Sequence, residues 1–191
     1  DNILIQTDYS FYNVDVNLDA GKTIIFDADL TVNGNLVVES GKLQIGDDGN
    51  DVRTFDINGD IDVQSNGLID VDRSNAGTAK HILYLAGNFT NEGTCRFSDV
   101  SNYDYNGSAV GIRVDVRFNN AISDQRVYLD GPTDFYRIVS DKGVDANYVL
   151  DIEASAAANF RLLGRNNFGG GGATGENQNA LGLKTGTVKL N

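Results

Sequence analysis

Carboxylates at alternating positions are the residues of this chain whose types and spacing could do chemistry. Residues two apart in a strand share a face, so the acids are expected to project outward together while apolar neighbours point inward. Glycoside hydrolases work with paired carboxylates, and a polysaccharide lyase also needs a cation or tyrosine beside its acids. Only Arg53 and Arg73 lie close in sequence, and solvated acids on an acidic protein are the simpler interpretation. The acids are Asp56, Asp60, Asp62, Asp70 and Asp72.

The same segment offers oxygen ligands for a metal ion. Asp56, Asn58, Asp60 and Asp62 alternate along it, and a bound Ca²⁺ would relieve repulsion between stacked acids. The segment lacks the glycine placement and final glutamate of an EF-hand loop. We therefore expect no required cofactor, and a structural Ca²⁺ at these four residues is the metal hypothesis.

Tyrosines mixed with asparagine and aspartate form two candidate ligand-binding segments. Tyr9 and Tyr12 lie in residues 8–13, and Tyr103 and Tyr105 lie in residues 102–107. Sugar-binding surfaces use such mixtures, because rings stack on pyranose faces while amides bond the hydroxyls. The alternative interpretation is that these tyrosines simply cover a loop or an end of the fold.

Nucleophilic catalysis finds little support, and no catalytic residue is predicted. The single histidine, His81, has no serine or cysteine signature around it and is expected at a strand edge or turn. The single cysteine, Cys95, excludes an internal disulfide and occupies a position filled by leucine or isoleucine in related segments. We expect it to be an inert buried thiol.

A repeat positions all of these residues. Three segments share one pattern of short alternating strands separated by glycine corners: Leu30–Ile45, Phe55–Val71 and Leu83–Phe97. Their corner glycines, Gly34, Gly59 and Gly87, recur at intervals of 25 and 28 residues. Short strands at this period cannot bury an apolar face alone, so neighbouring copies must stack. The predicted fold is all-β, a single right-handed parallel β-solenoid of roughly seven or eight turns, on the order of 35 Å long.

The alternation predicts which side chains fill the core and which backbone the corners need. Asn-Gly and Gly-Asp corners are expected to supply positive φ. The predicted core residues are Leu30, Val32, Leu36, Val38, Leu43, Ile45, Phe55, Ile57, Ile61, Val63, Ile69, Val71, Leu83, Leu85, Phe89 and Phe97.

The domain organisation is predicted as one unit, residues 1–191, and as a fragment of a longer chain. Beyond the third copy, strands are expected at 112–118, 126–129, 135–139, 148–152, 160–163 and 181–190. At most one helical turn is expected between residues 152 and 163. Residues 164–179 are rich in glycine and asparagine and are predicted to form a loop.

Charge restricts the partners. The formal net charge is −12 with a pI near 4.3, so nucleic acid and acidic membrane surfaces would be repelled. No stretch is apolar enough to insert into a membrane. The acidic surface suits an extracellular or cell-surface location.

Two segments resemble the solenoid repeats of large secreted bacterial surface proteins, especially type IX secretion substrates. They are Leu30–Ile45 and the strands between Val116 and Val139. That resemblance implies an extracellular stalk, spacer or adhesive, fibre-forming module whose partners are glycans or other copies of the same or parent protein. The C-terminal sorting domain of that class has no counterpart in these residues. The alternative function is a carbohydrate-binding or polysaccharide-processing β-helix of lyase or hydrolase type.

Overall fold

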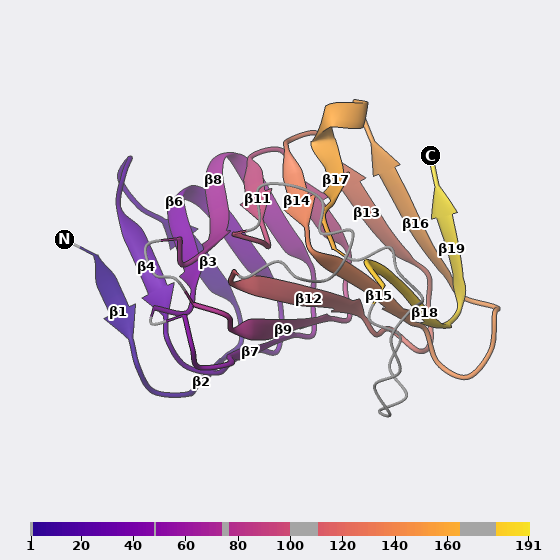
Figure 1. Ribbon diagram of the computed structural model, residues 1–191, viewed down its shortest axis with the longest axis horizontal. Coiled ribbons are helices and arrows are strands. Elements are labelled where there is room, and N and C mark those ends of the chain that lie inside the picture. The colour runs from indigo at the N-terminus through magenta and orange to yellow at the C-terminus, as the bar shows by residue number, and fades with distance from the viewer. Residues whose placement is uncertain (1, 48, 74–76, 100–110, 165–178) are drawn as a thin grey trace.

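The computed structural model describes residues 2–47, 49–73, 77–99, 111–164 and 179–191, and nearly all regular secondary structure in this part of the chain is β-strand (Figure 1). One short 3-10 turn, η1 (Ala157–Asn159), interrupts the strands, in agreement with the single helical turn expected there. The strands are β1 (Ile3–Ile5), β2 (Tyr9–Phe11), β3 (Val14–Asn17), β4 (Thr23–Phe26), β5 (Leu30–Val32), β6 (Leu36–Ile45), β7 (Thr54–Ile57), β8 (Ile61–Val71), β9 (Lys80–Leu85), β10 (Phe89–Asn91), β11 (Thr94–Arg96), β12 (Arg113–Phe118), β13 (Gln125–Leu129), β14 (Thr133–Phe135), β15 (Arg137–Asp141), β16 (Val149–Ala154), β17 (Phe160–Leu162), β18 (Leu181–Thr185) and β19 (Thr187–Leu190).

The strands form two parallel sheets. A seven-stranded sheet runs β2-β5-β7-β9-β12-β15-β18, and the other strands form a twelve-stranded sheet. Within the larger sheet, what we call the first row is β3-β6-β8-β10-β13-β16-β19 and the second row is β1-β4-β6-β8-β11-β14-β17. The long strands β6 and β8 contribute to both rows. From β2 onward the chain visits the seven-stranded sheet, the first row and the second row in turn, an arrangement compatible with a parallel β-helix.

The core between the sheets includes all of the residues predicted from the alternation. Every one of them is buried, with at most 2% of its surface exposed. The strand register aligns equivalent repeat positions, such as Leu36 with Ile61 and Leu43 with Ile69. Cys95 pairs with Ile69 in the same row and is fully buried, as expected from the repeat. The sequence pattern therefore identified both the register and the inward face.

The positive φ predicted for the glycine corners was wrong for the three glycines of the repeat. Gly34, Gly59 and Gly87 do not have positive φ. A Cβ on Gly59 would lie 2.5 Å from the carbonyl oxygen of Gly34, and one on Gly87 would lie 2.2 Å from that of Gly59. Glycine is needed at these corners because the backbone of the preceding turn passes too close for any side chain.

Two of the strands predicted in the C-terminal half, residues 135–139 and 181–190, each contain a corner that divides them between two strands of the structure. The chain turns at Tyr136, so β14 joins the second row while β15 joins the seven-stranded sheet. It turns again at Gly186, where φ is +84°, between β18 and β19. The inward residues on either side are Phe135 and Ile138 at the first corner, and Leu181 and Val188 at the second, so the alternation changes phase at both.

Buried polar side chains hold the corner that follows β12. Gln125 donates through Nε2 to the carbonyl oxygen of Leu85 at 2.9 Å. Its Oε1 accepts a hydrogen bond from Nζ of Lys142 at 2.8 Å, and that Nζ also donates to the carbonyl oxygen of Ser123 at 2.8 Å. Lys142 is fully buried, and burial lowers the pKa of its ammonium group to about 8.

Lys142 should make folding stability depend on pH. Between about pH 8 and the ordinary lysine pKa, the unfolded chain keeps a proton that the folded protein has released, so raising the pH favours the folded state. We expect wild type to gain up to about 1.4 kcal/mol of unfolding free energy per pH unit over this window relative to Lys142→Met. Urea unfolding of both proteins at pH 7, 8, 9 and 10 measures this difference. Parallel pH profiles would contradict it.

Candidate functional site

A ladder of side-chain hydrogen bonds runs along one edge of the first row. The backbone NH of Asn35 donates to Oδ1 of Asn13 at 2.8 Å, and the NH of Asp60 donates to Oδ1 of Asn35 at 3.0 Å. The NH of Asn88 then donates to Oδ1 of Asp60 at 2.6 Å, and the NH of Arg126 donates to Oδ1 of Asn88 at 2.9 Å. We call this set of residues the corner ladder. The side chains of its first four residues each accept the backbone NH of the next turn.

Asp60 is therefore a structural acceptor. Its Oδ1 also accepts from Nδ2 of Asn88 at 3.2 Å. Asparagine fills the equivalent position in the turns before and after it, so this ladder position requires an oxygen acceptor and not a negative charge. The sequence singled out Asp60 as a candidate acid because the acceptor role is indistinguishable from a catalytic one in spacing alone.

The other predicted metal ligands are divided between the two sheets. Asp56 lies on β7, paired with Thr31 and Tyr84 in the seven-stranded sheet, whereas Asp62 lies in the first row and Asn58 in the corner between them. In the part of the chain that the structure describes, no group of three or more His, Cys, Asp or Glu side chains could hold a metal ion. The calcium hypothesis therefore stays a sequence-based prediction.

A groove of about 600 Å³ lies on the outward face of the first row, and we call it the first-row groove. Its floor follows the strand register across four turns, from Val37 through Asp62 and Thr90 to Tyr128. The corner ladder forms one wall. The residues lining the groove are Asn35, Val37, Asp60, Ile61, Asp62, Asn88, Thr90, Glu92, Arg126 and Tyr128.

One end of the groove is held in place by an ion pair and a ring contact. Nη2 of Arg126 donates to Oε2 of Glu153 at 2.6 Å, and its guanidinium lies over the Tyr128 ring, 5.0 Å from the centroid. The hydrogen bond to Glu153 and its charge raise the pKa of Arg126. The ion pair and the ring contact together place the arginine against the tyrosine at this end of the groove.

The floor, by contrast, carries polar groups without partners. Within the described residues, the side chains of Asp62, Thr90 and Glu92 make no hydrogen bond or ion pair. The groove therefore combines two open carboxylates and a hydroxyl with an aromatic ring and a paired guanidinium.

A second polar row crosses the outward face of the second row. Asp70, Arg96, Asp134 and Arg161 occupy equivalent positions in four successive turns, so their charges alternate. Arg96 lies 2.5 Å from Asp70, and Arg161 lies 3.3 Å from Asp134. Asp70 is buried, which raises the pKa of its carboxyl group, and the nearby Arg96 opposes that shift. The expectation that Asp70 and Asp72 are solvated outward acids was wrong, because both side chains are buried.

Of the predicted tyrosines, Tyr9 and Tyr12 do not line this groove. Tyr9 lies on β2 at the first turn, where its ring stacks on Phe11 with centroids 5.5 Å apart. Tyr12 follows that strand and is 78% exposed. Tyr103 and Tyr105 lie outside the described residues, as do residues 165–178 of the predicted loop. The tyrosine hypothesis for ligand binding stays untested.

The two candidate nucleophile residues are both internal. His81 lies within β9, almost fully buried, and its Nδ1 accepts a hydrogen bond from the backbone NH of Arg53 at 3.0 Å. His81 is the second residue of that strand, so its expected place at the start of a strand is confirmed, and its burial adds to that expectation. Burial raises the pKa of the Cys95 thiol, so the reactive thiolate form is suppressed.

Sequence reasoning missed most of the groove. Val37, Asp62 and Thr90 occupy equivalent positions of the three copies, so the repeat alignment contained three of the four strand positions on the floor. Glu92 was not considered, and Arg126 and Tyr128 lie beyond the third copy. A strand signal was recognised at 126–129, but its register with the repeats was not.

Comparisons of the chain with protein-family models, curated proteins and solved structures gave no match. Among the described residues, no helix has the length and apolar character needed to cross a bilayer.

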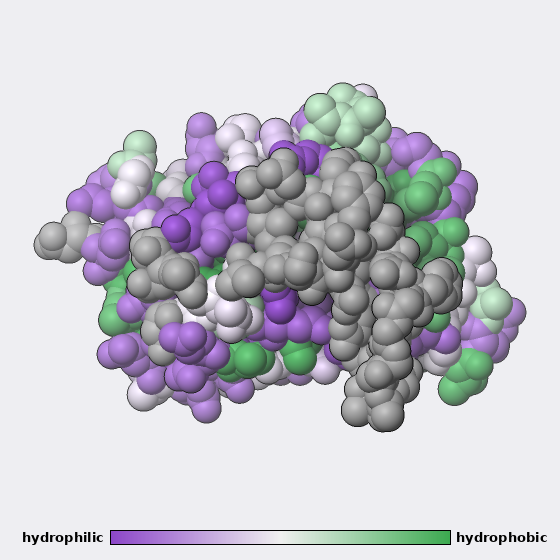
Figure 2. All heavy atoms as spheres, in the orientation of Figure 1, coloured by the Kyte–Doolittle hydropathy of each residue, from purple (hydrophilic) through white to green (hydrophobic). Residues whose placement is uncertain are grey.

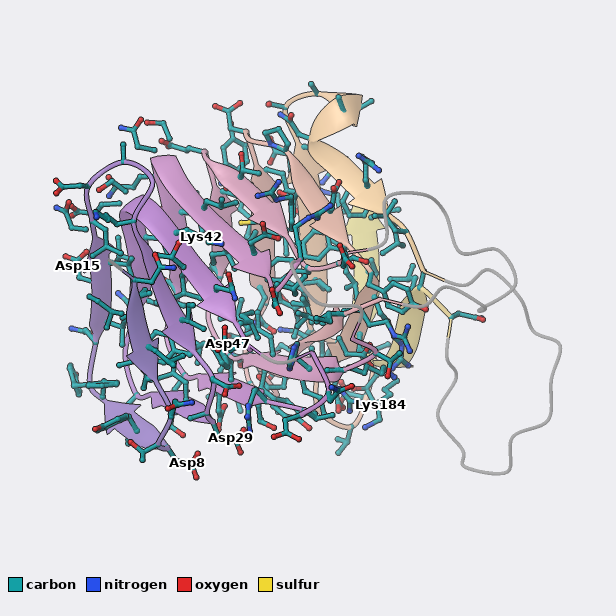
Figure 3. All side chains as sticks on the ribbon, turned by 60° about the vertical axis from the view of Figure 1, so that its left-hand side comes forward. Asp8, Asp15, Asp29, Lys42, Asp47 and Lys184 are labelled. Carbon is teal, nitrogen blue, oxygen red and sulfur yellow. The ribbon has the colours of Figure 1, made fainter. Side chains whose placement is uncertain are left out.

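Hydrophilic residues cover much of the surface visible in Figure 2. Acidic Asp8 and Asp15 lie toward one end of the stack and Lys184 toward the other (Figure 3).

Proposed function

We propose that this chain is a structural segment: a right-handed parallel β-solenoid of about seven turns that serves as a stalk, spacer or fibre-forming module of a secreted or cell-surface protein. The right-handed sense is the one that nearly all parallel crossover connections adopt. The order of strands supports the turn count, because the seven-stranded sheet receives one strand from each passage of the chain.

The observation that carries this proposal is the corner ladder. Each turn supplies an acceptor for a backbone NH of the next, from Asn13 to Arg126. Close glycine corners accompany it, with the carbonyl of Gly59 packed under Gly87. These are contacts between nearest-neighbour turns, the type of interaction that lets a solenoid be lengthened by adding turns. A chain built this way is suited to setting distances.

Deletion of one whole turn tests the proposal. Removal of residues 36–60 joins Asn35 directly to Ile61, which occupies the same place in the first row as Leu36. We expect a folded, cooperatively unfolding protein whose maximum dimension in small-angle X-ray scattering is shorter by about 5 Å, one strand spacing.

Deletion of residues 36–61 is the matched control. It places Asp62 directly after Asn35, so the following strand presents its polar residues to the core. We expect this variant not to fold. If both deletions fold equally well, or if the first abolishes folding, the stack of interchangeable turns is refuted and the structural proposal with it.

A further inference from the structure

We infer that the first-row groove is a binding site for an uncharged or amino-bearing glycan chain lying along the axis of the stack. This goes beyond the structural role, which does not require any ligand. The inference rests on the contrast between the floor of the groove and its walls.

The side chains that form the walls already have hydrogen-bond or ion-pair partners within the protein. Asn35, Asp60 and Asn88 use their side-chain oxygens to accept backbone NH groups, and Arg126 is paired with Glu153. They can shape a ligand's path without rearranging. The floor groups Asp62, Thr90 and Glu92 have no partner of their own in the described structure. They supply the acceptors, and one hydroxyl donor, that a ligand can use.

The chemistry of these floor groups selects the ligand. Two carboxylates that accept hydrogen bonds suit a molecule rich in hydroxyl or ammonium donors. Val37 and Tyr128 provide apolar surface at either end of the floor, which suits the C–H faces of sugar rings. An anionic polymer is disfavoured because Asp62 and Glu92 would repel it.

A linear polymer fits the direction of the groove. Equivalent positions recur every strand spacing of about 4.8 Å along the stack, close to the rise of one sugar unit in an extended chain. A peptide adding as a strand is disfavoured, because β8 and β10 are each hydrogen-bonded to a strand on both sides and present no free backbone edge.

Isothermal titration calorimetry of the protein with defined hexaoses tests the inference. The probes are cellohexaose, mannohexaose, laminarihexaose and partly deacetylated chitohexaose, with hexagalacturonate as the anionic comparison and hexalysine as the peptide comparison. We expect saturable binding of at least one neutral or amino hexaose. Asp62→Asn combined with Glu92→Gln should weaken that binding at least tenfold while leaving the urea unfolding midpoint unchanged.

Asp19→Asn combined with Asp56→Asn is the control, since it removes two negative charges whose residues do not line the groove. Its affinity should equal that of wild type. The inference is overturned if no hexaose binds at roughly millimolar concentrations, if both double variants lose affinity equally, or if hexagalacturonate or hexalysine binds more tightly than every neutral and amino hexaose. Failure of these titrations leaves the turn-deletion result, and hence the structural proposal, standing.

Discussion

Gly93→Ala is expected to destabilise the protein by at least about 3 kcal/mol, a large cost for one added methyl group. Gly93 lies at the corner between β10 and β11. A Cβ there would lie 2.3 Å from the carbonyl oxygen of Gly67 and 2.4 Å from that of Gln64. Both oxygens belong to the backbone of the preceding turn, so neither can rotate away as a side chain would. The strands on both sides of the corner must separate to admit the methyl group.

Gly21→Ala provides the matched control for this substitution. Gly21 has a φ of +81°, and a Cβ there would meet nothing within 4 Å. Its cost should therefore be conformational alone, about 1–2 kcal/mol. Urea unfolding monitored by circular dichroism compares the two variants. Equal destabilisation would mean that the stacked corners are loose enough to accept a side chain.

The glycine corners also show how far the sequence alone leads. Their spacing was enough to predict stacked turns, because a regular period of short strands has few other ways to bury its apolar residues. The spacing did not show why glycine is required at each corner, because a positive φ and a close backbone contact both select glycine. Gly59 belongs to the second kind, and only the arrangement of neighbouring turns reveals this.

The outward face was harder to predict than the core. An inward position is defined by hydrophobicity, which is visible in the sequence, whereas an outward acid has several indistinguishable roles. Asp60 caps the next turn, Asp70 is buried beside Arg96, and Asp62 remains open in the groove, although all three have the same alternating spacing. Their partners lie one turn away, at 25 to 28 residues, where no local pattern identifies them.

Phenylalanine rings fill the core in the middle and C-terminal turns. The Phe135 ring stacks on Phe97 with centroids 5.5 Å apart, and its centroid lies 6.0 Å from that of Phe89 and 5.9 Å from that of Phe160. Phe135 is fully buried. It is thus the ring through which three neighbouring turns are in contact, and its removal leaves a cavity that none of them can fill without moving its own strand.

Phe135→Ala should therefore cost about 4 kcal/mol or more, from lost burial, the cavity and the ring contacts together. Phe160→Ala is the comparison, because that ring is only partly buried and contacts the cluster through Phe135. We expect it to cost roughly half as much. Urea unfolding measures both, and added benzene should raise the melting temperature of the Phe135→Ala variant alone, since an apolar cavity of this kind takes up such a ligand. A cost below about 2 kcal/mol, or stabilisation of wild type by benzene, would mean that the turns are held together by their corners and hydrogen-bonded edges and not by the aromatic core.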